Sequence, residues 1–523
     1  MASPLNDPQD GQGSEWSERM FASEEAAFPH KLTKNGPFAA TSLAMDDMRP
    51  ARETSARSPD VALSGSDKLS VWPGRWLAVA STRGLALADQ AVVSGTSFLT
   101  TVMIARWAYP NELGIYAMAI SLLVSWVAVQ ETLVLLPYTV HRHRSQAPPT
   151  EQAGSYLTLS GLFSILGIVI FSLTALGLSI ATAPHGLVAA ILILAAAVPF
   201  ASLREFGRRF AFAHLRVLPS LALDLATSVL QLGGLAWLGH TGRLSAATAC
   251  AAISVAYTVP SVMWLHFSRG NFARHQGQLR KTVSQSWGFG KWLLATRITE
   301  SLRTQAVFWL LALAIGTAAT GAYAACLSIV SFANPIIMGL FNILLPLASL
   351  ALANGGGTRL QRETIRDALL LGAGMALLCV LVAFGGERAM LFLFHGSHYE
   401  GQGHTLLVLA LALLASAVGM PAASALATIE RSYAIFWASL IATVATVVPV
   451  SLLVLKWGLV GAAYGLLAGN VAGTLARWAA FLHFVQQLEP QVASNAAAAL
   501  RDRLRQSTVD PSAGSGVNGA GRA

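Results

Sequence analysis

The stretch SYLTLSGLFSILGIVIFSLTALGLSI (residues 155–180) contains no charged side chain. After five further residues, GLVAAILILAAAVPFASL (residues 186–203) is again free of charge. A transmembrane helix needs about 20 largely apolar residues to cross the hydrocarbon core of a bilayer. Each stretch is therefore predicted to cross a membrane once.

The rest of the chain has the same character. Of its 523 residues, 54% are hydrophobic and 12% are charged, whereas soluble globular domains carry about 25% charged residues. Between residues 84 and 486, only 34 of 403 side chains are charged. Such a segment is solvated by lipid, which excludes an ordinary soluble enzyme and predicts an all-α polytopic membrane protein.

Twelve membrane-spanning helices are expected. Their predicted ranges are 86–106, 113–136, 155–180, 186–203, 218–238, 245–266, 292–316, 321–350, 368–386, 404–429, 433–455 and 459–484. Prolines inside the spans either kink the helices or simply permit their packing, since spans tolerate proline; these are Pro199, Pro260, Pro335, Pro421 and Pro449.

Polar segments flank and divide these spans. Residues 1–80 are rich in Ser, Pro, Asp and Glu, and they are predicted to form a disordered N-terminal extension. Residues 487–523 are predicted to form a disordered C-terminal tail. The longest central polar connection, residues 268–290, is predicted to link two six-helix bundles at residues 84–267 and 291–486.

The basic residues between the spans predict the orientation. Four fall in connections predicted to be external, namely Arg106, Arg243, Arg388 and Lys456. Fifteen fall in connections predicted to be internal: Arg142, Arg144, Arg204, Arg208, Arg209, Arg216, Arg269, Arg274, Arg280, Lys281, Lys291, Arg359, Arg362, Arg366 and Arg431. Because cytoplasmic loops of membrane proteins carry an excess of Lys and Arg, both termini are predicted to be cytoplasmic.

The two halves share short sequence matches. GIYAMAIS (residues 114–121) aligns with GAYAACLS (residues 321–328), and the tripeptide LLP occurs at 135–137 and at 344–346. Within each half, both segments lie in the second predicted span. Paired repeats around a site in the middle of the membrane are a transporter architecture.

Motifs of soluble catalysis are absent from the sequence. There is no phosphate-binding G-x-x-x-x-G-K-[ST] loop and no G-x-S-x-G or H-E-x-x-H motif. Cys250, Cys326 and Cys379 fall in apolar segments and are interpreted as small core residues. An external loop contains three histidines and a glutamate that suit a metal or acid/base site, but a solvated turn is the simpler interpretation; they are His395, His398, Glu400 and His404.

Three charged residues, Arg297, Glu300 and Arg303, lie at membrane depth in the seventh span. If this span began only at Thr304, it would reach about 20 Å, which is short of a core about 30 Å thick. The spacing of three residues places these side chains on one stripe with net charge +1. The stripe either faces a hydrated cavity and attracts an anionic substrate, or forms an ion-pair triad that fixes helix packing.

Three carboxylates inside spans are candidates for coupling transport to H⁺ or Na⁺, because a carboxylate in low dielectric tends to hold a proton unless it is paired. They are Asp89, Glu131 and Asp224. Asp89 is alternatively expected to pair with Arg83, and the other two to serve packing. The arginines of one internal loop are interpreted as topology determinants, or as contacts to anionic head groups; these are Arg204, Arg208, Arg209 and Arg216.

Several segments resemble bacterial polysaccharide flippases of the multidrug/oligosaccharidyl-lipid/polysaccharide (MOP) exporter superfamily. The first is ADQAVVSGTSF (residues 88–98), which is followed by Ala105-Arg106 and by Gly114-Ile115-Tyr116. The others are WGFGKW (287–292), TGAY (320–323), Asn334-Pro335 and GLVGAA (458–463). The similarity covers about residues 80–486. Twelve spans suit this branch better than the fourteen of the peptidoglycan-precursor branch.

This resemblance implies two six-helix bundles around a central cavity that opens alternately to either side. It implies translocation of a polyprenyl-pyrophosphate-linked oligosaccharide across the bacterial cytoplasmic membrane, for exopolysaccharide, capsule or O-antigen synthesis. Membrane lipids, a polysaccharide polymerase and export machinery are the expected partners. No catalytic residue, resident metal or cofactor is expected, apart from a coupling H⁺ or Na⁺.

The candidate substrate-binding residues are Arg297, Arg303, Arg83 and Arg106. The candidate residues for ion coupling or charge pairing are Asp89, Glu300, Asp224 and Glu131. Two alternatives remain open. One is a cation-coupled multidrug exporter, and the other is a membrane-embedded glycan transferase or ligase that uses the histidine-rich loop.

Overall fold

The computed structural model describes residues 72–142, 148–214, 216–273, 278–394 and 399–509, all within one compact unit. In these ranges the chain forms helices joined by short turns, and it contains no strand. The predicted all-α membrane fold is thus confirmed. Residues 1–71, which belong to the predicted N-terminal extension, lie outside the described residues.

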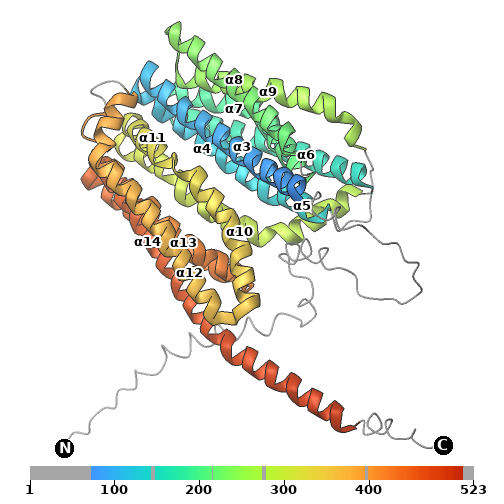
Figure 1. Cartoon of the computed structure of the whole chain (residues 1–523). Coiled ribbons are helices and arrows are strands. Elements are labelled where there is room, and N and C mark those ends of the chain that lie inside the picture. The colour runs from blue at the N-terminus through green and yellow to red at the C-terminus, as the bar shows by residue number, and fades with distance from the viewer. Residues whose placement is uncertain (1–71, 143–147, 215, 274–277, 395–398, 510–523) are drawn as a thin grey trace, which may run out of the picture. The chain divides into compact units, whose positions relative to one another are not determined.

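The helices of the first half lie side by side in Figure 1, from blue to green. They are α3 (Trp72–Trp107), α4 (Pro110–Gln130), the π-helix η1 (Glu131–Leu135), α5 (Leu136–His141), α6 (Pro149–Ile180), α7 (His185–Ala213), α8 (Val217–His240), α9 (Ala246–Ser268) and the 3-10 turn η2 (Arg269–Asn271). The π-helix falls just before Pro137, whose missing N–H prevents the regular helical hydrogen bond there.

The helices of the second half run from yellow to red in Figure 1. They are α10 (Gln278–Ile315), α11 (Thr317–Ser331), α12 (Asn334–Phe394), α13 (Gly403–Thr428) and α14 (Ser432–Val509). Two of these helices are much longer than one membrane crossing. At about 1.5 Å per residue, the 61 residues of α12 would reach about 90 Å as one straight helix.

Both long helices are divided by glycines with non-helical backbone angles. Gly355 and Gly356 interrupt α12, and Gly458 interrupts α14. Gly356 and Gly458 have φ values of +62° and +56°, which glycine adopts at little cost. Ten described helices are long and apolar enough to span a membrane. Division of α14 at Gly458, together with a span formed by α11 and the start of α12, brings the number of crossings to the predicted twelve.

Of the mid-span prolines, Pro335 coincides with a helix break, because α11 ends at Ser331 and α12 begins at Asn334. The helices continue through Pro199, Pro260 and Pro421. Pro449 likewise lies within α14, away from its kink.

Three polar segments are more helical than predicted. Helix α3 begins at Trp72, inside the predicted N-terminal extension, and α10 begins at Gln278, inside the predicted linker. Helix α14 continues through the first part of the predicted C-terminal tail to Val509. The start of α3 and the end of α14 are therefore not set by the limits of the apolar runs.

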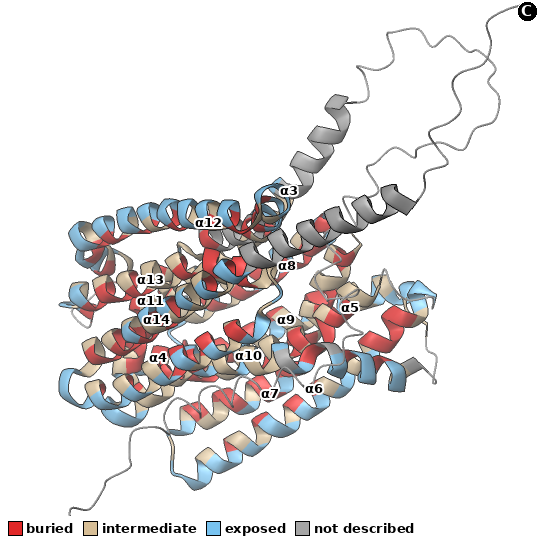
Figure 2. Ribbon diagram, turned by 90° about the horizontal axis from the view of Figure 1, so that it is seen from below, coloured by how far each residue is buried: buried red, intermediate tan, exposed pale blue. Residues whose placement is uncertain are grey.

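Exposed apolar side chains mark the surface that faces lipid. Figure 2 shows exposed residues along α12 in pale blue. Large exposed residues of α12 include Leu369, Leu370, Leu377, Leu381 and Phe384, and those of α6 include Leu162, Ile165, Leu166, Val169 and Leu173. A soluble protein rarely exposes such continuous apolar faces, whereas a bilayer solvates them.

The two halves meet mainly along α4, α10 and α11. Helix α4 packs against α7 of its own half and also against α10 and α11. The end of the molecule that carries the arginine-rich connections is named the basic end. The opposite end holds the turns near residues 108, 182, 242 and 316 and is called the far end.

Candidate functional site

A buried charged cluster joins α3, α7 and α8 near the basic end. This first cluster consists of Asp89, Arg204, Glu205, Arg208 and Asp224. Arg204 donates to Oδ1 of Asp224 at 2.5 Å, and Nε of Arg208 donates to Oδ2 at 2.7 Å. Nη2 of Arg208 also lies 3.2 Å from Oδ2 of Asp89. Both arginines also donate to Glu205, at 2.8 and 2.9 Å.

The first cluster contains more negative than positive charge. Three carboxylates face two guanidinium groups, so the formal sum is −1 when every group is ionised. Asp89 and Asp224 are 1% and 0% exposed. Ser220 donates to Oδ1 of Asp89 at 3.3 Å, and the Tyr257 ring lies 5.3 Å from the Arg204 guanidinium. A buried excess charge is costly, so the cluster is suited to hold one proton or one small cation.

The structure adds to two expectations about this cluster. Asp89 pairs with Arg208, and its expected pairing with Arg83 stays a prediction, because the Arg83 side chain lies outside the described residues. The interpretation of Arg204 and Arg208 as head-group contacts is wrong, because their side chains are 11% and 16% exposed and form buried ion pairs. Their role as topology determinants stays a prediction. Glu205 was not anticipated, although its position three residues before Arg208 was a signal for a pair on one helix face.

Arg209 and Glu131 form an ion pair between α7 and η1. Their side chains are 38% and 23% exposed, so this pair is more accessible than the first cluster. The guanidinium of Arg297 on α10 lies close enough to Arg209 for the two positive charges to repel each other. These three residues therefore place a formal charge of +1 where α10 packs against η1.

A second charged cluster lies inside the other half. It consists of Glu300, Arg303, Ser439, Asn470 and Arg477. Arg303 donates to Oε2 of Glu300 at 2.6 Å and also to the side-chain oxygen of Asn470. Ser439 donates to Oε1 of Glu300 at 2.8 Å, and Arg477 lies 3.9 Å from the same oxygen.

The second cluster ties α10 to both arms of α14. Ser439 precedes the kink at Gly458, whereas Asn470 and Arg477 follow it. The amide of Asn470 also donates to the Ala412 carbonyl of α13 at 2.8 Å. One carboxylate faces two guanidinium groups, so the formal sum is +1, opposite in sign to that of the first cluster.

The three charged residues of the predicted stripe on α10 thus differ in their contacts. Glu300 pairs with Arg303, which is 7% exposed and held by helix contacts, as the packing alternative expects. Arg297 is exposed, and among the described residues it has no ion-pair partner. Ser301, one turn from Arg297 on the same face, donates to Ser125 of α4 at 2.8 Å. Arg297 therefore lies at the junction between the halves.

Arg106, predicted to bind substrate, lies at the far end. It donates to the Leu393 carbonyl at 2.5 Å and to the Phe392 carbonyl at 2.8 Å. These carbonyls belong to the last turn of α12, where carbonyl groups lack helical partners. In this structure Arg106 connects α3 to α12, and its role toward a substrate stays a prediction.

The matched glycines of the two halves touch each other at the far end. A Cβ on Gly114 would clash with the Thr317 carbonyl and lie 3.0 Å from the Gly321 nitrogen. A Cβ on Gly321 would clash with the Pro110 carbonyl and lie 3.0 Å from the Gly114 nitrogen. The contact is reciprocal, as expected of equivalent positions near a pseudo-twofold axis. It packs α4 closely against α11 at the far end.

The close contact between Gly114 and Gly321 leads to a testable prediction. Gly321→Val is expected to lower the free energy of unfolding by about 1–3 kcal/mol, because added atoms must displace the backbone of α4. Gly233→Val is the matched control, since a Cβ there has no neighbour within 4 Å. Thermal unfolding of the purified variants in detergent measures both. Equal melting temperatures for the two variants would contradict the close contact.

The histidine-rich loop is only partly described. His395 and His398 lie outside the described residues. Nε2 of His404 lies 3.0 Å from the Tyr464 hydroxyl, and nothing in the described structure connects His404 to Glu400. In the described part of the chain, no group of three His, Cys, Asp or Glu side chains is placed to hold a metal ion. Cys250, Cys326 and Cys379 are buried and free of disulfides, as predicted.

The chain matches no protein-family model and no curated protein sequence. Solved structures do match. An inward-facing multidrug resistance MATE family transporter of the MOP superfamily is 14% identical, with a TM-score of 0.58 over 78% of this chain and 95% of that one. The lipid II flippase MurJ, in an inward closed conformation, is 12% identical, with a TM-score of 0.59 over 75% and 86% of the chains.

The MATE transporter VcmN of Vibrio cholerae in its bent form is 17% identical, with a TM-score of 0.54 over 79% of this chain and 98% of that one. At these identities the likeness shows the fold. The chain therefore has the fold of MOP superfamily transporters, as its resemblance to flippases of that superfamily predicted. Both MATE transporters and a lipid II flippase have this fold.

Proposed function

We propose that this chain translocates a polyprenyl-pyrophosphate-linked oligosaccharide across the bacterial cytoplasmic membrane, for exopolysaccharide, capsule or O-antigen synthesis. The polar and anionic head group of such a lipid cannot cross about 30 Å of hydrocarbon unaided. The two halves open alternately to either side, so that the head group passes between them while its lipid chain stays in the bilayer. The protein itself makes and breaks no covalent bond.

The observation that carries this proposal is the guanidinium of Arg297 at the junction between the halves, which has no ion-pair partner among the residues that the structure describes. Arg209, itself partly exposed, supplies a second guanidinium nearby. Two guanidinium forks suit the oxygens of a pyrophosphate, because each presents several N–H donors in fixed geometry. Arg303, in contrast, is already matched by Glu300 and Asn470, so its proposed role is to hold α10 in position.

A cation-coupled multidrug exporter is the second candidate. It is favoured by the surplus carboxylate of the first cluster and by the fold shared with MATE transporters. However, the surplus carboxylate is buried behind two arginines, whereas the accessible group at the junction carries net positive charge. A cationic drug needs negative groups where it binds, so the accessible charge favours an anionic substrate.

The first cluster is our candidate for the site that couples transport to a cation gradient. Its formal charge of −1 is balanced when Asp89 or Asp224 holds a proton, or when Na⁺ binds among the carboxylates. A cation gradient that changes this occupancy shifts the equilibrium between conformations, provided that the two conformations differ in affinity for the cation. Glu131 takes part instead in the accessible pair with Arg209.

We place the basic end and both termini on the cytoplasmic side, because of the charge bias between the spans. The substrate then enters near Arg297 from the cytoplasmic leaflet, and the far end opens to release it. A polysaccharide polymerase and export machinery act on the released product. The remaining alternative, a glycan transferase or ligase, depends on the histidine-rich loop at the far end.

Depletion of the protein in its native host tests the proposal. We expect loss of surface polysaccharide and accumulation of lipid-linked oligosaccharide on the inner leaflet, where an impermeant oxidant of sugars does not reach it. Resistance to cationic drugs is expected to stay unchanged. Normal polysaccharide with increased drug sensitivity would favour the exporter. If the triple variant His395→Ala/His398→Ala/His404→Ala restores surface polysaccharide in the depleted cells, the enzyme alternative is excluded.

A further inference from the structure

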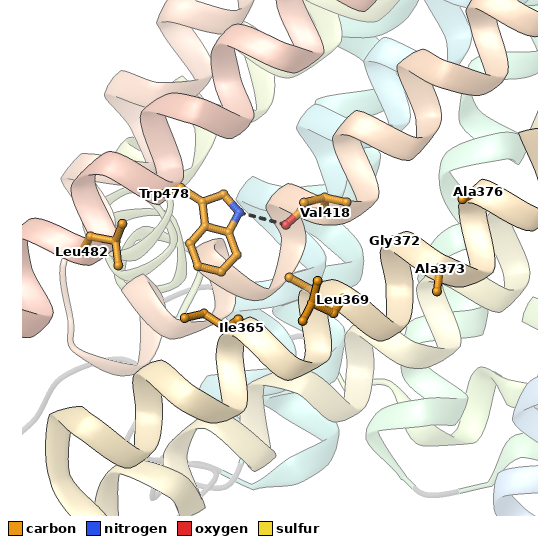
Figure 3. Close-up of a pocket in the computed structure, with 9 residues that line it drawn as sticks. Ile365, Leu369, Gly372, Ala373, Ala376, Val418, Trp478 and Leu482 are labelled. Carbon is orange, nitrogen blue, oxygen red and sulfur yellow. Dashed lines mark hydrogen bonds between the residues drawn. The ribbon is translucent and has the colours of Figure 1, made fainter.

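A groove of about 600 Å³ runs along the outer surface of the second half, between α12, α13 and α14. Figure 3 shows Ile365, Gly372 and Ala376 along one wall and Trp478 on the other. All of its lining side chains are apolar. The indole N–H of Trp478 donates to the Val418 carbonyl at 3.1 Å, so this polar atom is satisfied within the wall (Figure 3).

The groove has the length of one membrane leaflet. From Ile365 to Ala376, α12 rises by about 16 Å at 1.5 Å per residue, which is about half of a hydrocarbon core about 30 Å thick. Since the second arm of α12 begins at its glycine kink at the basic end, the groove opens on the leaflet at that end. No lining residue comes from α10 or from the first half, so the groove is separate from the Arg297 junction.

Positive charge lies at the basic end of the groove. Arg362 lies one turn from Ile365 on the same face of α12, and Arg359 lies one turn further. Both are exposed, and neither forms an ion pair with any residue that the structure describes. Arg366, in contrast, lies 2.7 Å from Glu363 and 3.4 Å from Asp367. Two guanidinium groups without an ion-pair partner in the described part of the chain thus lie within two helical turns of Ile365, at the end of the apolar channel.

We propose that the groove binds one acyl chain of an anionic phospholipid from this leaflet, with the lipid phosphate at Arg359 and Arg362. The apolar lining accommodates the chain, and the two arginines distinguish an anionic head group from a zwitterionic one. Bound lipid packs between α12 and Trp478 and supports their packing. This inference depends on the groove and its charges alone, and it holds for either transported substrate.

Native mass spectrometry of the purified protein in detergent tests this site, with phosphatidylglycerol or phosphatidylcholine as the probe. We expect one retained phosphatidylglycerol, preferred over phosphatidylcholine by about tenfold or more, because each basic residue near the head group adds to the attraction. Arg359→Gln/Arg362→Gln is expected to abolish this preference. Arg388→Gln, an exposed arginine at the other end of α12, is the matched control.

A second pair of variants tests the groove itself. Ala373→Phe/Ala376→Phe fills the groove from exposed positions and is expected to lower lipid retention by about tenfold. Leu370→Phe, also exposed but outside the groove, is expected to retain lipid. Equal retention of the two phospholipids, or unchanged retention by the arginine variant, would overturn the proposal. Preferential retention of a polyprenyl phosphate would overturn it in favour of a substrate site.

Discussion

Polysaccharide export is expected to fall by about tenfold or more when Arg297 is replaced by alanine. The variant loses a guanidinium that no described carboxylate neutralises, and a hydrogen bond to a charged group contributes about 2 kcal/mol. A loss of that size corresponds to more than a tenfold change in affinity. Surface polysaccharide, normalised to the amount of folded protein, is the measurement.

The controls separate substrate binding from folding. Arg297→Lys keeps the charge but loses the fork, so it is expected to restore export only in part. Arg303→Ala is expected to act differently, by lowering the amount of folded protein, because it leaves Glu300 and Asn470 without their main partner. Arg388→Ala is expected to change neither export nor the amount of folded protein. Full export by Arg297→Ala at normal protein level would remove the basis for an anionic substrate at this residue.

The largest effect on stability is expected from Arg208→Ala. Arg208 contacts Asp89, Glu205 and Asp224, so its loss changes the formal charge of the first cluster from −1 to −2. Breaking a buried ion pair by removing one partner costs about 3–5 kcal/mol. Thermal unfolding in detergent is expected to show a much lower melting temperature.

A second substitution restores the balance. In Arg208→Ala/Asp224→Asn the formal charge returns to −1, so the double variant is expected to be more stable than Arg208→Ala alone. Such non-additivity is typical of residues in one network. If the melting temperature of the double variant falls by the sum of the two single decreases, the formal charges assigned to the cluster do not explain its stability.

The membrane spans were predictable because apolar runs and their length carry most of the information. The helix breaks were less so. Gly458 divides α14 where the sequence predicted the end of one span and the start of the next, but the chain stays helical up to the glycine. Beyond the apolar run, α14 continues to Val509, because helix propensity does not end where hydropathy does.

The charged residues were predictable one by one, and their pairing was not. Asp89 and Asp224 are more than 130 positions apart, and only the packing of α3 and α8 brings them to the same arginine. Local spacing correctly predicted that Glu300 neutralises a neighbouring arginine. It did not decide between Arg297 and Arg303, which are both three residues from Glu300. Asn470, Arg477 and Ser439 select Arg303, and they come from a helix more than 130 residues further along the chain.

Translocation by the purified protein in vesicles tests the central claim most directly. The vesicles carry a polyprenyl-pyrophosphate-linked oligosaccharide in one leaflet, and an impermeant reagent reports its arrival in the other. We predict transfer by the wild-type protein and little transfer by Arg297→Ala, with no comparable transfer of a cationic dye. Equal transfer by both proteins, or movement of the dye alone, would contradict the account.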